Sequence, residues 1–170
     1  MCGIFGLVVN KSRTITNKNQ LDQALDVLSH RGPDQSGIYF NKQVYLGHKR
    51  LSIIDPGNGK QPMISNDKRY IITFNGEIFN YKSIRNILIK KGYSFKTNSD
   101  TEVILSAFDF FSFDCLQYFN GMFSFAIWDT LKKQLFLARD RFGIKPLFFS
   151  MPKNKIIFGS EIKSLYKSGI

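Results

Sequence analysis

Short runs of apolar and β-branched residues, each bounded by turn-forming residues, constrain the fold of this 170-residue chain more than any other feature. They span residues 4–9, 37–40, 43–47, 70–74, 122–128, 134–138, 147–150 and 155–158. Six of the eight runs form three pairs separated by a few polar residues, which is the pattern of β-hairpins. The runs therefore favour antiparallel sheets over a fold built from alternating βαβ units.

Three other segments carry apolar residues at the three- and four-residue spacing of an amphipathic helix. They cover residues 21–28, 84–88 and 104–111. The first pattern ends before Gly32 and Pro33, and Gly92 suits a C-terminal cap for the second. Ser99 and Glu102 form a capping-box pattern before the third. Because helices and hairpins are separate along the chain, we expect an α+β fold of stacked sheets covered by helices.

The size and composition of the chain fit one globular domain. Its 43% hydrophobic and 22% charged residues rule out a disordered protein. No apolar run reaches the roughly 18 residues that a membrane-spanning helix requires. The N-terminus also lacks the charged flank and apolar block of a secretory signal. We therefore expect a cytoplasmic protein that has no membrane partner.

The chain is strongly basic, with 24 Lys and Arg residues against 13 Asp and Glu residues and a net charge of +11. Such an excess would suit a protein that binds nucleic acid. The basic residues are dispersed, however, and no segment alternates arginine with aromatic residues. We therefore attribute the charge to background composition and predict no nucleic-acid partner.

The two cysteines and two histidines show no pattern typical of a metal site. Cys2 and Cys115 are too few for a disulfide framework, and their spacing from His30 and His48 matches no known zinc motif. Cys115 lies among apolar residues and is expected to be an inert buried thiol. Both histidines are expected to be structural. The sequence thus predicts no metal.

Cys2 follows the initiator methionine, and its small side chain favours removal of Met1. Removal would place a thiol and a free α-amine on one residue. The pKa of such an amine is about 7.7–8.0, so it can act as a general base toward its own thiol. The alternative is an ordinary residue at a frayed terminus, against which the apolar run at 4–9 provides an anchor.

An attacking thiol requires hydrogen-bond donors near the negative oxygen that forms when it adds to an amide. Asn75 and Gly76 follow the run at 70–74 and offer a side-chain amide beside a backbone N–H. Asn-Gly is also the commonest pair in tight hairpin turns, so a purely structural turn is the alternative.

Two charged residues lie in contexts that suit ligand recognition. Arg50 is flanked by apolar residues and could hold a carboxylate with its guanidinium fork, or form an internal salt bridge with Asp55. Asp100 begins the third predicted helix, where a carboxylate is also favoured by the helix dipole alone. The residues themselves leave both alternatives open.

Eight motifs together resemble the class II glutamine amidotransferase domain, and most of all the N-terminal glutaminase domain of glutamine-hydrolysing asparagine synthetases. They lie at residues 1–6, 31–34, 50–53, 74–80, 99–102, 120–123, 139–147 and 159–163. Sugar-phosphate and purine-pathway members of the class usually differ at 31–34. The resemblance covers essentially the whole chain, and it implies one domain over residues 2–170 after removal of Met1.

The resemblance implies an N-terminal nucleophile hydrolase fold, which is a four-layer αββα sandwich of two mainly antiparallel sheets. By position, Cys2 would be the nucleophile that forms a γ-glutamyl thioester, with its own α-amine as base. Asn75 and the Gly76 N–H would form the oxyanion hole. Glutamine would be the substrate, and the reaction in this domain would need no cofactor.

The resemblance also assigns the residues that hold glutamine. Arg50 would bind the α-carboxylate, and Asp100, assisted by Glu77, the α-ammonium. The backbone of the loop that follows Arg50 would line the pocket. That loop comprises Leu51, Ser52, Ile53 and Ile54.

The destination of the ammonia is implied to lie outside this chain, because the Ser-Gly-Gly-x-Asp-Ser loop of an ATP-pyrophosphatase domain is missing. The partner would be a synthetase domain, in cis or in trans, that uses ATP and Mg to make asparagine from aspartate. The basic segment 153–167 is expected at that interface. Two alternatives remain open: an asparagine-synthetase-like enzyme of cell-surface sugar biosynthesis, and a catalytically silent glutamine-binding module.

Overall fold

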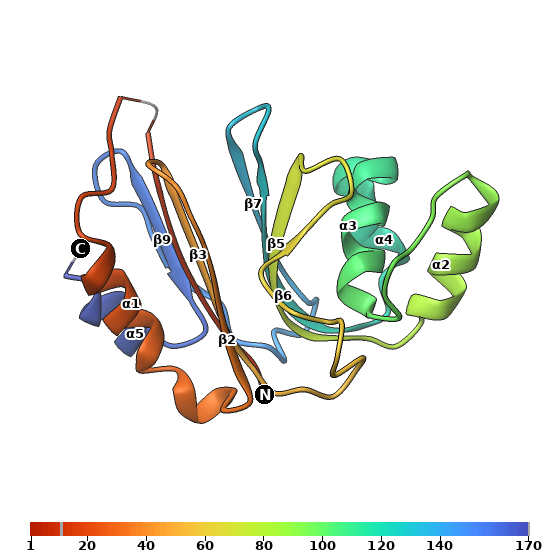
Figure 1. Cartoon of the computed structure of the whole chain (residues 1–170), viewed down its shortest axis with the longest axis horizontal. Helices are drawn as coiled ribbons and strands as arrows, with labels where there is room; N and C mark the ends of the chain where they lie inside the picture. Colours follow the sequence, from red (N-terminus) through yellow and green to blue (C-terminus); the bar gives the residue numbers. More distant parts are fainter. Residues whose placement is uncertain (11, 170) are drawn as a thin grey trace.

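Two antiparallel sheets stack on each other in the computed structural model, which describes residues 1–10 and 12–169 (Figure 1). The first sheet has the strand order β2-β3-β1-β9-β8 and the second the order β4-β5-β6-β7. The first contains β1 (Gly3–Val9), β2 (Gln35–Phe40), β3 (Val44–Arg50), β8 (Phe148–Ser150) and β9 (Lys155–Gly159). The second contains β4 (Met63–Ile64), β5 (Tyr70–Ile78), β6 (Gly121–Asp129) and β7 (Gln134–Arg139).

Helices cover the outer face of each sheet (Figure 1). α1 (Lys18–Asp26) and α5 (Ile162–Lys167) lie on the first sheet. α2 (Tyr81–Lys90), α3 (Asp100–Phe111) and α4 (Cys115–Tyr118) lie on the side of the second. Two 3₁₀ turns, Ser29–Arg31 and Ser112–Asp114, complete the helical elements. The predicted αββα sandwich is therefore confirmed. None of the described helices is long and apolar enough to cross a membrane.

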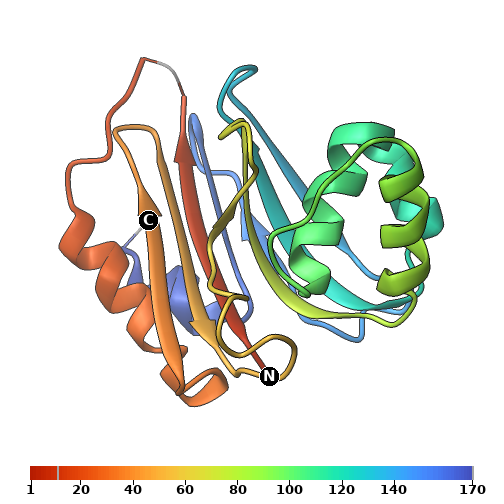
Figure 2. The ribbon, with the colours of Figure 1, turned by 45° about the vertical axis from the view of Figure 1, so that its right-hand side comes forward.

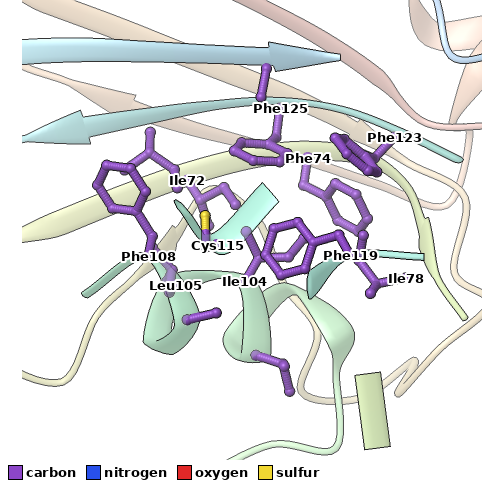
Figure 3. Packing of buried hydrophobic residues seen from close by; sticks show 14 of the residues in the cluster. Ile72, Phe74, Ile78, Ile104, Leu105, Phe108, Cys115, Phe119, Phe123 and Phe125 are labelled. Carbon is purple, nitrogen blue, oxygen red and sulfur yellow. The ribbon is translucent and has the colours of Figure 1, made fainter. Parts of the chain in front are cut away.

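Three apolar layers hold the sandwich together. One lies between α1 and the first sheet, and a second lies between the two sheets, where Ile4, Leu46 and Trp128 meet. The third packs the second sheet against α3 and includes Phe74, Phe125 and the buried Cys115 thiol (Figure 3). Because both faces of each central strand are covered, β1 is buried along its whole length.

The predicted strands are all present, but β5 is longer than its apolar run indicates. It continues through Asn75, Gly76 and Glu77 to Ile78, and these residues pair with β6 in regular antiparallel register. The interpretation of Asn75-Gly76 as a segment that follows the strand, or as a hairpin turn, is therefore wrong. Cross-strand pairing with β6 keeps the chain extended despite a local sequence that favours a turn.

The helix ends agree with the sequence patterns only in part. Gly92 follows α2 at φ +93°, as expected for a cap. At α3, the Ser99 hydroxyl accepts a hydrogen bond from the Glu102 N–H, but the Glu102 carboxylate accepts from the N–H groups of Lys96 and Thr97 instead of returning to Ser99. The capping box is thus half formed, because the preceding loop takes the carboxylate. The elements β4, α4 and α5, as well as both 3₁₀ turns, have no counterpart in the predicted elements.

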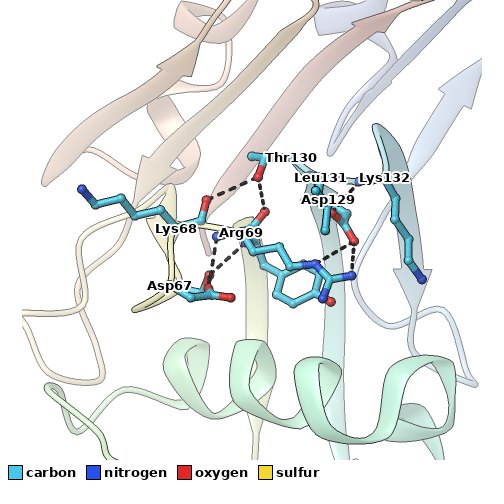
Figure 4. Close-up of polar contacts among 9 residues, drawn as sticks. Asp67, Lys68, Arg69, Asp129, Thr130, Leu131 and Lys132 are labelled. Carbon is cyan, nitrogen blue, oxygen red and sulfur yellow. Dashed lines mark hydrogen bonds and ion pairs between the residues drawn. The ribbon is translucent and has the colours of Figure 1, made fainter.

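A polar network around Arg69 and Asp129 holds the turn that joins β6 to β7 (Figure 4). Arg69 donates two hydrogen bonds to Asp129 Oδ2, at 2.9 and 3.2 Å, and the other carboxylate oxygen accepts from the N–H groups of Leu131 and Lys132. The Thr130 hydroxyl donates to the Arg69 carbonyl at 2.9 Å. This network fixes the hairpin turn.

The fold places the N-terminus at an edge where both sheets end. β1 is the middle strand of the first sheet and pairs with β3 and β9. Figure 2 shows the N-terminus beside the loop that leads from β3 toward β4. The start of β1, the end of β3 and this loop are therefore neighbours.

The apolar layers predict a strong contrast between two identical substitutions. Phe158 is fully buried between the sheets, whereas Phe142 is 90% exposed. Phe158→Ala should lower the free energy of unfolding by about 3–5 kcal/mol, because it leaves a cavity in a packed core. Phe142→Ala should change it by less than about 0.5 kcal/mol. Urea denaturation of both variants checks the assignment, and equal effects would contradict the layer between the sheets.

Candidate active site

A cavity of about 190 Å³ opens where β1 begins and where β3 and β5 end. Every site residue predicted from the sequence lines it except Ser52. The Ser52 N–H donates instead to Asp34 Oδ2 at 2.7 Å, and its buried hydroxyl has no partner among the described residues. The cavity also has lining residues that the sequence did not indicate. They are Met1, Gly59, Gln61, Phe74, Ser99, Thr101, Met122 and Lys145.

Cys2 is held in the cavity by bonds on both its side chain and its backbone. Its Sγ accepts from the Leu51 N–H at 3.4 Å and lies 3.6 Å from the Leu51 carbonyl oxygen. Arg31 Nε donates to the Cys2 carbonyl at 2.9 Å, and the same guanidinium pairs with Glu161. A frayed terminus is thereby excluded. Burial raises the pKa of the Cys2 thiol, so its attack requires a base.

One edge of β5 beyond β4 is open toward the cavity. β4 pairs only with Ile71 and Ile72, and farther along the same edge the Phe74 N–H donates to Gln61 Oε1 and the Ile78 N–H to Asp100 Oδ2. Because N–H groups of alternate residues in a strand point to the same side, the Gly76 N–H faces this open edge between them.

Asn75 and Gly76 together supply donors at the cavity wall. Asn75 is only 1% exposed, and its side-chain Nδ2 has no hydrogen-bond partner in the described part of the chain. A buried donor without a partner is costly unless a ligand satisfies it. Glycine is required at 76, because a Cβ there would overlap the Met122 carbonyl across the sheet. The pair therefore suits stabilisation of a negative oxygen.

Arg50 is a buried cation whose bonds go to neutral acceptors. One terminal nitrogen donates to Gln35 Oε1 at 3.0 Å and to the Pro56 carbonyl at 2.8 Å. The other donates to the carbonyls of Ile54 and Asp55 at 3.0 and 2.8 Å. The side chain of Asp55 accepts from Asn98 and Asn58 instead, so the salt bridge considered as an alternative is not formed. The charge of Arg50 is thus oriented but not neutralised by a carboxylate within residues 1–10 and 12–169.

Asp100 and Glu77 give the cavity negative charge. Asp100 is 4% exposed and accepts from the Ile78 N–H at 3.1 Å, so the carboxylate is bound to β5 as well as placed at the start of α3. Burial, together with a smaller contribution from the charge of Glu77, raises the pKa of Asp100 to about 6. A neighbouring ammonium would relieve both effects.

Gln61 is the clearest of the residues that sequence reasoning missed. Besides accepting from the Phe74 N–H at 2.7 Å, it donates to the Thr101 hydroxyl at 3.4 Å and so connects β5 with α3. A glutamine in a polar loop carries no local signal of such a role. Met122 and Lys145 lie in two of the recognised motifs, but nothing in those motifs indicates which side chain faces the cavity.

The wall of the cavity therefore combines a thiol, the unpartnered Asn75 amide beside the Gly76 N–H, two cations (Arg50 and Lys145) and two carboxylates. Its volume lies below the about 300–1,000 Å³ of pockets for drug-sized ligands, so it suits a small molecule. Opposite charges on the wall select a zwitterion. Among the described residues, no group of three or more potential ligands is placed to hold a metal ion.

Comparison with known proteins defines the class. The family described as "Glutamine amidotransferase domain" matches residues 1–169, and the chain belongs to this family. It is 42% identical over 167 residues to asparagine synthetase [glutamine-hydrolyzing] 3 of Bacillus subtilis, covering 97% of this chain and 27% of that protein. With the Zea mays asparagine synthetase [glutamine-hydrolyzing] it shares 37% identity, over 97% of this chain and 28% of that protein. The resemblance recognised in the sequence is confirmed.

The chain spans about a quarter of the length of these curated relatives. A solved structure of glutamine phosphoribosylpyrophosphate amidotransferase from B. subtilis, complexed with ADP and GMP, superposes with a TM-score of 0.81. At 21% identity it covers 99% of this chain and 44% of that one. This likeness confirms the fold class. Ile170, the predicted end of the domain, lies outside the described residues.

The raised pKa of Asp100 predicts a pH-dependent cost to folding. An unfolded aspartate ionises near pH 3.9, so between about pH 4 and pH 6 the folded protein binds more protons than the unfolded chain, and stability falls as the pH rises through this window. Asp100→Asn keeps an acceptor for the Ile78 N–H but has no proton to lose. Urea unfolding should therefore show the variant gaining stability over the parent from pH 4 to pH 7. Parallel curves would contradict a buried, ionisable Asp100.

Proposed function

We propose that this chain is the glutaminase part of a glutamine-dependent amidotransferase and hydrolyses glutamine to glutamate and ammonia. The observation that carries the proposal is the Cys2 thiol in a cavity that also contains Arg50, Asp100 and the donors of β5. The family of the domain and the names of its relatives support the same reaction.

The charges of the cavity determine how glutamine would bind. Its α-carboxylate would pair with Arg50, whose guanidinium is already oriented by loop carbonyls. Its α-ammonium would pair with Asp100 and Glu77, which would favour the charged form of Asp100. With both charged groups on the α-carbon held, the γ-carboxamide at the other end of glutamine is left to face Cys2.

The reaction would proceed through a covalent intermediate. The Cys2 α-amine takes the thiol proton as sulfur adds to the carbonyl carbon of the γ-carboxamide, and the resulting negative oxygen accepts from Asn75 Nδ2 and the Gly76 N–H. Collapse of this intermediate breaks the carbon–nitrogen bond, and the protonated α-amine of Cys2 gives its proton to the departing ammonia. Water then cleaves the thioester to give glutamate and the free thiol.

The base in this mechanism requires that Met1 be removed, because an amide nitrogen cannot accept the thiol proton. Met1 lines the cavity beside Cys2, so its removal would also enlarge the space for substrate. Thiol, amine and hydrogen-bond donors supply every step, so we propose that the domain works without a metal or cofactor.

We further propose that a synthetase domain uses the ammonia to make asparagine, with ATP and Mg acting there. The relatives that match are about four times as long as this chain and are named for that product. An exposed apolar stretch lies next to the cavity in sequence, since Lys145 lines the cavity while its neighbours Phe142, Ile144 and Phe149 are exposed. This stretch, in addition to the basic segment 153–167, would form the interface. Two unpaired thiols in the described part of the chain suit the cytoplasm.

Substitution of the nucleophile tests the proposal directly. Cys2→Ala should lower ammonia release from glutamine by more than about 1,000-fold, because no other thiol lines the cavity among the described residues. Cys115→Ala, which removes the thiol buried between the second sheet and α3, should retain activity. A coupled assay for glutamate and ammonia measures both variants.

Mass spectrometry of the purified chain provides the control for this experiment. The proposal expects a mass without Met1. A chain that keeps Met1, binds glutamine and releases no ammonia would instead favour a silent glutamine-binding module.

The role of Arg50 is tested by a change that keeps its charge. Arg50→Lys should raise KM for glutamine by about 10- to 100-fold and affect kcat less, because a lysine cannot make the four bonds that orient the charge of Arg50 in the cavity. Arg141→Lys is the control, since Arg141 likewise donates to backbone carbonyls, those of Phe119 and Leu116, but does not line the cavity. Equal changes in KM for the two variants would refute recognition by Arg50.

A further inference from the structure

His48 is a fully buried polar residue for which the mechanism above has no use. It lies on β3 two residues before Arg50, so both side chains point from the same face of the strand toward the second sheet. Burial and the charge of Arg50 lower the pKa of His48 to about 4, so the ring is neutral under ordinary conditions. The sequence indicated only a structural role for it.

The ring makes one hydrogen bond, and that bond joins the two sheets. His48 Nε2 lies 3.0 Å from the carbonyl oxygen of Phe74 on β5. A carbonyl oxygen can only accept, so Nε2 carries the proton and donates. Nδ1 is left without a partner in the described part of the chain.

The acceptor of this bond is the carbonyl of a residue whose backbone groups have no partner strand on this edge of the sheet. β4 pairs with Ile71 and Ile72 and then ends, so the next peptide on this edge of β5 has no strand beside it. Gln61 satisfies the Phe74 N–H and His48 satisfies the Phe74 carbonyl. The two side chains replace the missing strand at the residue immediately before Asn75.

The position of this peptide determines where the oxyanion donors lie. Asn75 carries the unpaired Nδ2, and Gly76 presents its N–H on the same open edge as Phe74. Cys2 comes from the first sheet and these donors from the second, so the distance between them depends on how the two sheets are held. Of the polar side-chain bonds that cross between the facing strands, His48 to Phe74 lies nearest in sequence to the donors.

We propose that His48 is a positioning residue for glutamine hydrolysis. It fixes the backbone at Phe74 so that the donors of Asn75 and Gly76 keep their position relative to the Cys2 sulfur. This inference rests on the proposed function. It concerns the transition state more than glutamine binding, because the donors act when negative charge develops on the oxygen. Loss of the bond should therefore lower kcat and leave KM nearly unchanged.

A matched pair of substitutions separates the hydrogen bond from the volume of the ring. The amide nitrogen of a glutamine at 48 can reach the position of Nε2, whereas that of an asparagine reaches only the position of Nδ1. We expect His48→Asn to lower kcat by about 10- to 100-fold, and His48→Gln to retain at least ten times the kcat of His48→Asn. Equal kcat values for these two variants would overturn the proposal.

Thr73→Val is the control for a general effect of cross-sheet bonding. The Thr73 hydroxyl donates to the Gly47 carbonyl at 3.1 Å, so this variant removes the other bond between β5 and β3, one residue earlier on each strand. It should lose stability as His48→Asn does, but keep kcat within about twofold. If Thr73→Val lowers kcat as much as His48→Asn, the role of His48 is merely structural.

Amide hydrogen exchange provides a readout that does not depend on turnover. Exchange of the Phe74 N–H should be faster in His48→Asn than in Thr73→Val, which loses similar stability and therefore sets the background rate. Faster exchange in a protein that releases no ammonia would show that the proposed function had failed while the positioning role held. Exchange in His48→Asn no faster than in Thr73→Val would overturn the positioning role.

Discussion

The rest of the structure depends on the use of the first residues of the chain as the middle strand of a sheet. Chain ends are usually loose, but Gly3 to Val9 pair on one side with β3 and on the other with β9. The Cys2 sulfur therefore starts from a fixed point, and its contacts with Leu51 are made by backbone that the same pairing holds. A reactive group at a terminus becomes as well ordered as one within a helix or strand.

The layer between the two sheets changes character along its length. At one end it is mainly apolar, with Leu46, Ile71 and Trp128 in one cluster, and Trp128 Nε1 is the buried polar atom there that has no partner in the described part of the chain. Toward the cavity it contains His48, Asn75 and Ser124, each with a buried polar atom that has no partner in the described part of the chain. Such groups reduce stability, and proteins retain them where a ligand or a transition state uses them. The apolar end supplies the cohesion that allows the polar end to stay poorly satisfied.

Local patterns predicted the strands and three helices because burial on both faces leaves a dense apolar record in the sequence. The motif residues Cys2, Arg50 and Asp100 were also predictable, since each carries a distinctive chemical group near the end of an element. Gln61 was not, because its role depends on contacts with residues 13 and 40 positions away. His48 was interpreted as structural for the same reason, and β4 is too short, at two residues, to leave a pattern.

The sequence also suggested the wrong backbone for Asn75-Gly76, although it identified the residues themselves. A turn and a strand end offer the same two donors, so the chemistry could be inferred without the conformation. Only the register with β6 decides between them, and register is a property of paired strands that one strand's composition does not reveal.

The central position of β1 has a practical consequence for anyone who produces this protein. An affinity tag or fusion partner joined ahead of residue 2 would convert the amine of Cys2 into an amide and would have to leave through the mouth of the cavity. Any leader at the front must therefore be cleaved back to the cysteine itself.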